Sequence, residues 1–142
     1  MRITLPSGTS AEIVHHESPV MGLVVAPDIF GLRPLYDDLV SRFSREWGMS
    51  VVAVEPFPGA ELGPDIDPRF AAVPALDDAK NLSDLLEAAD ALGTETVGLI
   101  GFCMGGMYCF KAARDERFVR IVSFYGMITL PEAWRSPTQG EP

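Results

Sequence analysis

Residues 97–109 read VGLIGFCMGGMYC, and this stretch decides the fold. The apolar residues before Gly101 predict a buried strand, and the segment after Gly106 is compatible with a helix. A sharp turn has to join the two, with Cys103 at its apex. Residues two before and two after such an apex crowd one another, which accounts for Gly101 and Gly105. The sequence therefore predicts a strand, a sharp turn and a helix, with a cysteine held at the turn.

The pattern G-x-C-x-G-G has the form of a nucleophile elbow in which sulfur replaces the usual serine oxygen. The N–H groups and the dipole of the following helix favour a negative charge at the apex. We therefore expect the Cys103 thiol to ionise more readily than a free thiol. Cys109 lies six residues further on, inside the predicted helix, and is expected to be a small buried apolar residue.

The composition indicates a single domain over residues 1–142. Hydrophobic residues make up 47% of the chain, which is enough for a core. The net charge of −9 argues against nucleic acid and anionic membranes as partners, and no apolar run approaches the length of a membrane span. The N-terminus lacks the apolar core of a signal peptide, and the two cysteines have neither disulfide-framework nor zinc spacing. We expect a cytoplasmic protein with free thiols, no metal and no cofactor.

The rest of the chain predicts alternating strands and helices. Two short strands around a turn at 6–9 predict an N-terminal hairpin, and apolar runs predict strands at 20–26, 50–54, 96–100 and 120–124. Helices are predicted at 34–47, 77–92 and 104–115. This order indicates an α/β fold with a doubly wound, mostly parallel sheet. The acidic, proline-rich segment 59–74 is long for a connector, so we expect it to be either mobile or part of a substrate lid.

Three further expectations concern side chains on these elements. The helix at 34–47 is expected to face the core with residues spaced four apart, namely Leu35, Leu39, Phe43 and Trp47. The acidic residues of the helix at 77–92 are expected on a solvated face. His15 and His16 are neighbours in a predicted strand, so their side chains face opposite sides and are expected to be surface histidines that form no common site.

Ligands of such sheets bind beyond the C-terminal ends of the strands. Two predicted loops with reactive groups meet there, one at 28–31 and one at Cys103. Asp28 directly follows its strand. Its carboxylate either approaches the thiol or only shapes the turn, and spacing alone favours neither.

With GLIGFCMGG at 98–106 and VVAPDIFGL at 24–32, the sequence resembles the dienelactone hydrolase family of the α/β-hydrolase superfamily. The resemblance implies that Cys103 attacks an ester or lactone carbonyl and that the backbone N–H groups of Ile29 and Met104 form an oxyanion hole. A family glutamate that helps deprotonate the thiol is replaced here by Asp28, one methylene shorter. Family arginines hold a substrate carboxylate, and Arg69 lies in roughly the corresponding loop.

The superfamily order is nucleophile, acid, then histidine. After Gly126 this sequence has no histidine, and its later acids are Glu132 and Glu141. We therefore expect the strands that carry the catalytic acid and histidine to lie outside these residues. Either the chain is the N-terminal part of a longer enzyme, or a second polypeptide completes it, or it is a short non-catalytic relative. The first two are preferred, because an open sheet edge and an uncovered core face promote aggregation.

The leading hypothesis is a thiol hydrolase that forms an acyl-thioester with a small ester or lactone. The expected partner is that small molecule, with neither nucleic acid nor membrane. One alternative is a glutamine amidotransferase with a cysteine elbow, although nothing else in the sequence resembles its surroundings. The other is a non-catalytic module that binds a ligand or senses redox state through the Cys103 thiolate.

Overall fold

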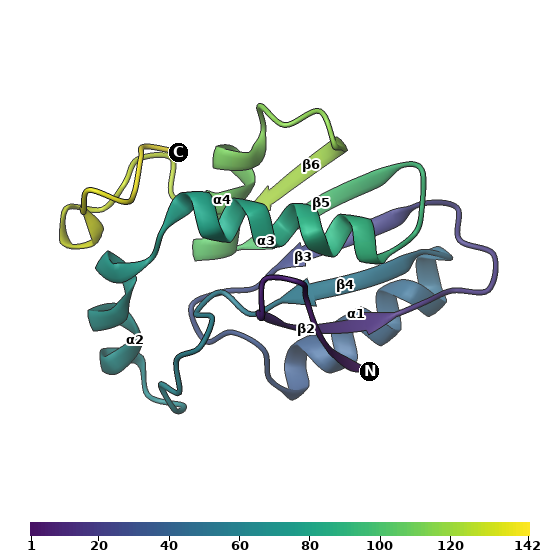
Figure 1. Cartoon of the computed structure of the whole chain (residues 1–142), viewed down its shortest axis with the longest axis horizontal. Helices are drawn as coiled ribbons and strands as arrows, with labels where there is room; N and C mark the ends of the chain where they lie inside the picture. Colours follow the sequence, from purple (N-terminus) through teal and green to yellow (C-terminus); the bar gives the residue numbers. More distant parts are fainter.

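The computed structural model describes residues 1–142 and shows a six-stranded sheet with helices on both faces (Figure 1). The strands are β1 (Arg2–Thr4), β2 (Ser10–Val14), β3 (Gly22–Ala26), β4 (Ser50–Val54), β5 (Val97–Phe102) and β6 (Phe118–Phe124). They lie in the order β1-β2-β4-β3-β5-β6. Strand β2 pairs antiparallel with both β1 and β4, and the neighbours among β4, β3, β5 and β6 pair parallel. The doubly wound, mostly parallel sheet with an N-terminal hairpin is confirmed.

The helices separate into two layers. They are α1 (Pro34–Trp47), α2 (Ile66–Ala72), α3 (Asp78–Ala91) and α4 (Met104–Ala112), with single 3₁₀ turns η1 (Val73–Ala75) and η2 (Glu132–Trp134). Helix α1 covers one face of the sheet, and α3 and α4 cover the other (Figure 1). No helix has the length and apolar character needed to cross a membrane.

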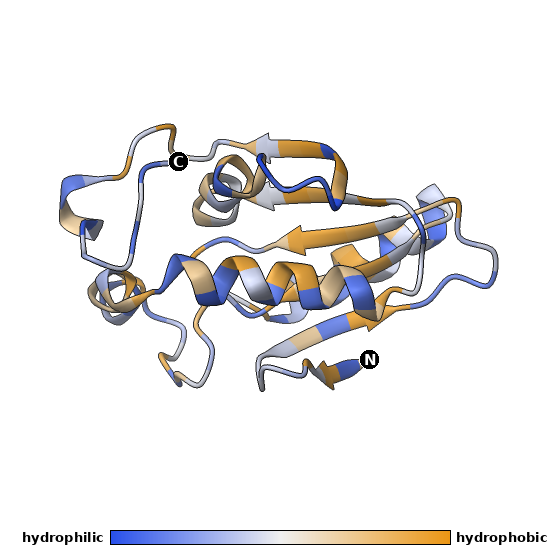
Figure 2. Ribbon diagram, turned by 45° about the horizontal axis from the view of Figure 1, so that its top comes forward, coloured by the Kyte–Doolittle hydropathy of each residue, from blue (hydrophilic) through white to orange (hydrophobic).

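Two hydrophobic clusters hold these layers together. The larger one lies between the sheet and α3 and α4, and the smaller one lies between the sheet and α1. Every residue of β3 and β4 is buried, because both faces of these strands are covered. That double coverage explains their unbroken apolar sequences, which are visible as mostly hydrophobic arrows in Figure 2.

The predicted core-facing stripe of α1 is confirmed in part, because Leu39 and Phe43 are partly buried and pack against the smaller core cluster. The buried residues of this helix are Tyr36, Val40 and Ser44. Leu35 and Trp47 are instead 48% and 45% exposed. The Tyr36 hydroxyl accepts a hydrogen bond from the Asp28 N–H at 2.9 Å, which fixes this side of the helix beneath the loop after β3. A spacing of four residues does not distinguish between adjacent stripes, and this loop contact selects one of them.

The solvated acidic face predicted for α3 does not include Asp84. This residue is 1% exposed, and its carboxylate accepts hydrogen bonds from Ser7 Oγ and Thr9 Oγ1, each at 2.7 Å. The Lys80 ammonium adds a charged donor at 2.6 Å. Three donors compensate for the loss of hydration, so the buried charge joins the hairpin turn to α3.

The segment 59–74, predicted to be mobile or a lid, contains α2 and leads into η1. No residue of α2 is buried by the rest of the chain. The C-terminal tail folds back onto this region, where Gln139 Nε2 donates to the Val73 carbonyl at 2.6 Å and the Trp134 ring lies 6.3 Å from that of Phe70. Helix α2 and the tail thus stand together beyond the C-terminal ends of the strands (Figure 1).

His15 and His16 lie just beyond the end of β2 and not within a strand. His16 Nδ1 accepts a hydrogen bond from the Ser18 backbone N–H at 3.2 Å, and the His16 backbone N–H donates to Ser50 Oγ at 3.0 Å. These hydrogen bonds hold the turn in which the chain leaves the sheet after β2.

Candidate active site

The turn between β5 and α4 has the strained geometry that its sequence predicts. Cys103 has φ 55° and ψ −116°, a backbone conformation that non-glycine residues rarely adopt. A Cβ on Gly105 would lie 2.0 Å from the Ala26 carbonyl oxygen, and one on Gly101 would lie 2.3 Å from the Gly105 oxygen. The glycines are therefore required by backbone packing on either side of the cysteine, and the strand, turn and helix are confirmed.

Hydrogen bonds fix the elbow to the end of β6. The Cys103 N–H donates to the Phe124 carbonyl at 3.0 Å, and the Cys103 carbonyl accepts from the Met107 N–H at 3.0 Å. Ser123 Oγ donates to the Gly106 carbonyl at 2.9 Å. These bonds support a strained residue from both neighbouring elements, as a preorganised site requires.

The environment of the thiol corrects the expectation of easy ionisation. Burial raises the pKa of Cys103, the Met104 backbone N–H lowers it, and the negative charge of Asp28 raises it again, with a net shift upward. The helix terminus is therefore outweighed by desolvation and a nearby carboxylate. Cys109 is fully buried, and burial raises its pKa to about 12, in agreement with the unreactive role expected of it.

The Asp28 carboxylate is bound to an arginine and not to the thiol. Arg33 Nη1 donates to Asp28 Oδ1 at 2.7 Å, and Arg33 Nη2 donates to Oδ2 at 2.9 Å. Asp28 Oδ1 also accepts from the Phe30 N–H at 3.0 Å, so the carboxylate shapes its own loop as well. Of the two possibilities left open by the sequence, the structure shows the turn-forming one, with the thiol within electrostatic range.

Arg33 was not recognised from the sequence, although it controls the charge beside the elbow. Its guanidinium lies 5.4 Å from the Phe30 ring centroid and 5.2 Å from that of Tyr36, in addition to its pair with Asp28. The hydrogen bond to Asp28 is the main cause that raises the Arg33 pKa. The signal in the sequence was Asp28 and Arg33 on either side of Gly31, because a tight loop can bring two side chains at this spacing into a bidentate ion pair.

Glu55 is a second residue that sequence reasoning missed. It follows β4, and its carboxylate accepts from the Leu32 N–H at 2.9 Å and the Phe57 N–H at 3.1 Å. Gly31 has φ 68°, and a Cβ there would lie 2.7 Å from Glu55 Oε1. Glu55 thus holds the loop after β3 from the neighbouring strand end. An acid directly after a buried parallel strand was the signal for this position.

Arg69 reaches the same loop from α2. Its Nη1 donates to the Ile29 carbonyl at 3.0 Å, and its Nε donates to the Gly63 carbonyl at 2.9 Å. The guanidinium also borders an open hollow of about 510 Å³, together with Arg33. The structure therefore places Arg69 against the Ile29 carbonyl, in the peptide group that follows the one carrying the Ile29 N–H.

The two backbone N–H groups that the resemblance implies are in positions where they can donate. The Ile29 N–H has no partner among the loop hydrogen bonds. Met104 is the first residue of α4, so its N–H has no acceptor within the helix. Both residues have buried side chains, which keeps their backbones fixed.

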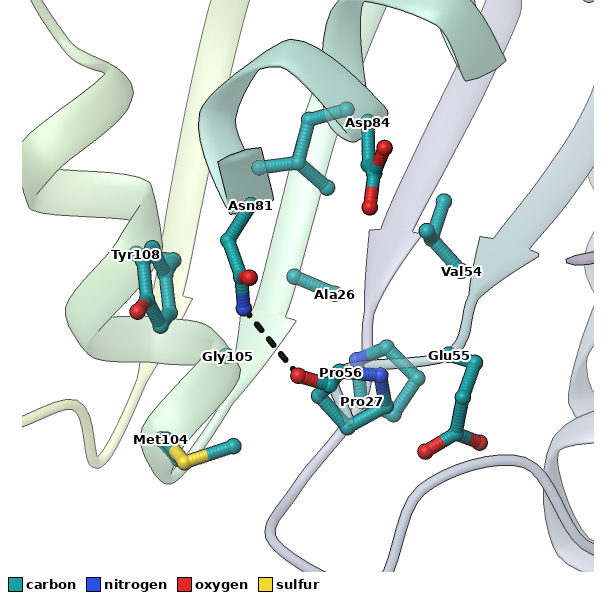
Figure 3. A pocket seen from close by; sticks show the side chains of 11 residues that line it. Ala26, Pro27, Val54, Glu55, Pro56, Asn81, Asp84, Met104, Gly105 and Tyr108 are labelled. Atoms are coloured by element: carbon teal, nitrogen blue, oxygen red, sulfur yellow. Dashed lines mark hydrogen bonds between the residues drawn. The ribbon is translucent and has the colours of Figure 1, made fainter. Parts of the chain in front are cut away.

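A small cavity of about 20 Å³ lies behind the elbow, lined in part by Ala26, Pro27 and Gly105 (Figure 3). Across it, Asn81 Nδ2 donates to the Pro56 carbonyl at 3.1 Å. The buried Tyr108 hydroxyl at its wall has no hydrogen-bond partner in the chain. A cavity of this volume suits one water molecule.

The pH dependence of thiol alkylation tests this electrostatic picture. Because the Cys103 pKa is raised, the rate at which this thiol reacts with iodoacetamide is expected to increase with pH and to have its inflection above that of a free thiol, whose pKa is about 8.5. Asp28→Asn removes a negative charge, so the inflection should move to lower pH. Peptide mass spectrometry separates Cys103 from Cys109. An inflection below that of free cysteine would contradict the role of burial.

The fold and the strained cysteine elbow define an α/β hydrolase. Residues 10–140 match the model of the dienelactone hydrolase family, and the chain belongs to that family. The crystal structure of a Klebsiella pneumoniae protein assigned as a dienelactone hydrolase superposes with a TM-score of 0.76 at 26% identity, covering 92% of this chain and 61% of that one.

Two curated relatives are similar over part of their length. Carboxymethylenebutenolidase 2 of Cupriavidus pinatubonensis is 30% identical over 105 residues, which are 72% of this chain and 44% of that protein. A Bradyrhizobium protein named as a probable 2-oxo-3-(5-oxofuran-2-ylidene)propanoate lactonase is 29% identical over 129 residues, 84% of this chain and 50% of that protein. The chain spans about half the length of these relatives.

Proposed function

We propose that this chain is the nucleophile-bearing part of a thiol hydrolase that acts on small esters or lactones. The observation that carries the proposal is the backbone of Cys103, held at φ 55° between β5 and α4. The other non-glycine residue with positive φ is Tyr125, at φ 42° directly after β6. Strain of this kind costs of order 1–3 kcal/mol and persists where the surrounding structure enforces it, most often at functional sites.

In the proposed reaction the Cys103 thiolate attacks the carbonyl carbon of the substrate. The oxyanion that forms would accept hydrogen bonds from the backbone N–H groups of Ile29 and Met104. On its collapse the ester C–O bond would break, the alkoxide would leave and take up a proton from water, and an acyl-thioester would remain. Its hydrolysis needs a base. We propose that the catalytic acid and histidine lie outside these 142 residues, because no histidine follows the nucleophile.

Asp28 and the two arginines are proposed to serve the same site. Burial is the main cause that raises the Cys103 pKa and keeps the resting thiol protonated; the negative charge of Asp28 adds to it, and Arg33 limits that addition by pairing with Asp28. Arg69 fixes the Ile29 peptide and is proposed to bind substrate. The Arg69 guanidinium borders the hollow and is paired with no carboxylate of the chain, which favours a substrate that carries a carboxylate, and the lactonase name of the Bradyrhizobium relative supports a lactone.

An activated ester tests the proposal on this chain as it stands. At pH 8.5, p-nitrophenyl acetate is expected to release about one equivalent of p-nitrophenol per chain and to add one acetyl group to Cys103, because thiolate alone attacks such esters. Intact mass and peptide mapping locate the adduct. An acetyl group on lysines, with Cys103 unmodified, would overturn the assignment of the nucleophile.

The alternative is a non-catalytic module that binds a ligand or senses redox state through the same thiol. Partial exposure of Cys103 is compatible with it. The raised pKa argues against it, since a sensor cysteine depends on a large thiolate fraction at neutral pH. The two separate by rate: an oxyanion hole should make the reaction of Cys103 with the ester faster, relative to its reaction with iodoacetamide, than the same ratio for a free thiol, whereas a sensor thiol should show the ratio of a free thiol.

A further inference from the structure

The loop between β3 and α1 has one backbone N–H group that differs from its neighbours. Four N–H groups of this loop donate to partners at 2.9–3.0 Å, namely Asp28 to Tyr36 Oη, Phe30 to Asp28 Oδ1, Gly31 to the Asp28 carbonyl and Leu32 to Glu55 Oε2. The Ile29 N–H lies between them in the sequence and has no partner in the chain. Pairing of the neighbouring N–H groups holds this one in place, so it is free to bind an acceptor that enters the site.

The direction of the Ile29 N–H is set two residues further along the chain. Ile29 shares its peptide group with the Asp28 carbonyl, and a peptide group is planar. That carbonyl accepts a hydrogen bond from the Gly31 N–H at 3.0 Å. Gly31 closes this turn with φ 68°, a conformation that favours glycine. The position of Gly31 therefore determines where the Ile29 N–H points.

The Glu55 carboxylate packs directly beside Gly31. A Cβ on this glycine would lie 2.7 Å from Glu55 Oε1 and 2.8 Å from Oε2. Oε2 accepts from the Leu32 N–H at 2.9 Å, and Oε1 accepts from the Phe57 N–H at 3.1 Å. Each carboxylate oxygen thus has its own N–H donor, one in the loop after β3 and one in the loop after β4. A carboxylate can accept both bonds at once because neither of its oxygens carries a proton.

Glu55 is itself anchored to the rigid part of the sheet. It directly follows β4, in which every residue is buried (Figure 3). Its backbone N–H donates to the Ser10 carbonyl of β2 at 2.9 Å. Arg69 also reaches this loop from a distant segment, but it belongs to α2, which has no buried residue. Of these two contacts, the one from Glu55 connects the loop to a fixed element, as a precise site requires.

We propose that Glu55 is a positioning residue for the hydrolysis at Cys103. Its carboxylate holds the turn at Gly31 so that the Ile29 N–H points to the place where the oxyanion forms. Glu55 acts through the loop and not on the reacting atoms. An amide in place of the carboxylate offers one acceptor and one donor, so one of the two backbone N–H groups would face a donor and the turn would shift. This inference rests on the proposed function, in which Cys103 attacks a carbonyl and the Ile29 N–H receives the oxyanion.

Glu55→Gln tests this role through two reactions of the same thiol. Attack on p-nitrophenyl acetate forms an oxyanion, whereas alkylation by iodoacetamide expels iodide and forms none. Both reactions use the Cys103 thiolate, so a change in its pKa cancels in the ratio of the ester rate to the alkylation rate. We expect Glu55→Gln to lower this ratio roughly ten-fold or more, and Glu61→Gln, at an exposed glutamate further along the chain, to leave it unchanged. Glu55→Asp keeps both acceptor oxygens but is one methylene shorter, so it should lower the ratio by a smaller factor. It replaces Glu55→Gln as the test if circular dichroism shows that variant to be unfolded.

The wild-type ratio separates failure of this inference from failure of the proposed function. A wild-type ratio above that of a free thiol, together with an unchanged ratio in the folded Glu55 variant, would overturn the positioning role and leave Cys103 as the nucleophile. An equal fall of both rates, which keeps the ratio constant, would show a general disturbance of the thiol and would overturn the role as well. A wild-type ratio equal to that of a free thiol would remove the oxyanion hole itself, and both proposals would fail.

Discussion

Cys103→Ser is expected to reduce the initial release of p-nitrophenol roughly 10³-fold or more. A serine hydroxyl is a far weaker acid than a thiol, so it needs a base that removes its proton during attack. No histidine follows position 103, and the Asp28 carboxylate is bound by Arg33 through two hydrogen bonds. The geometry of the elbow would be retained, but its oxygen would stay protonated. Stopped-flow absorbance and intact mass measure the loss.

Cys109→Ala is the matched control for this variant. Its thiol is buried and its pKa is raised to about 12, so removal of this sulfur should leave the burst unchanged. A circular dichroism spectrum like that of the wild type shows that both variants are folded. If serine at position 103 supported release at the original rate, the nucleophile would have to be sought elsewhere in the chain.

The elbow and the order of the elements could be predicted because local sequence determines them. Gly101, Cys103 and Gly105 form a pattern whose backbone crowding has few alternative explanations. The apolar runs of β3 and β4 likewise follow from burial on both faces. Such features depend on neighbours within a few residues, and for that reason their predicted positions differ little from those in the structure.

The charged contacts of the site depend on packing between distant segments. Asp28 was recognised, but whether its carboxylate turns to the thiol or to Arg33 is decided by a loop that Glu55 holds from the next strand. The Cys103 pKa was predicted in the wrong direction for the same reason. A helix N-terminus is visible in the sequence, whereas the burial that outweighs it is not.

Gly105→Ala is expected to destabilise the fold by more than about 3 kcal/mol, a large part of the stability of a domain of this size. Helix propensity alone predicts the opposite sign, because alanine is favoured over glycine by about 1 kcal/mol inside a helix. The new Cβ, however, would lie 2.0 Å from the Ala26 oxygen and 2.5 Å from the Pro27 oxygen. These are backbone atoms of β3 and its loop, so they cannot rotate away. The clash should therefore outweigh propensity.

A graded set of glycine variants makes this prediction sharp. At Gly106 a new Cβ would lie 2.7 Å from Ser123 Oγ and 2.8 and 2.9 Å from backbone atoms of Gly126 and Phe124, a milder overlap than the 2.0 Å at Gly105, so Gly106→Ala should cost less than Gly105→Ala. At Gly140 the nearest atom is 3.8 Å away, and Gly140→Ala should lie within about 0.5 kcal/mol of the wild type. Urea unfolding gives the three values, and soluble yield ranks any variant that does not fold. Since Gly105 packs α4 directly onto the backbone of Ala26 and Pro27, which leads into the loop that carries Ile29, equal stability of Gly105→Ala and the wild type would mean that the helix does not lie against this backbone as described.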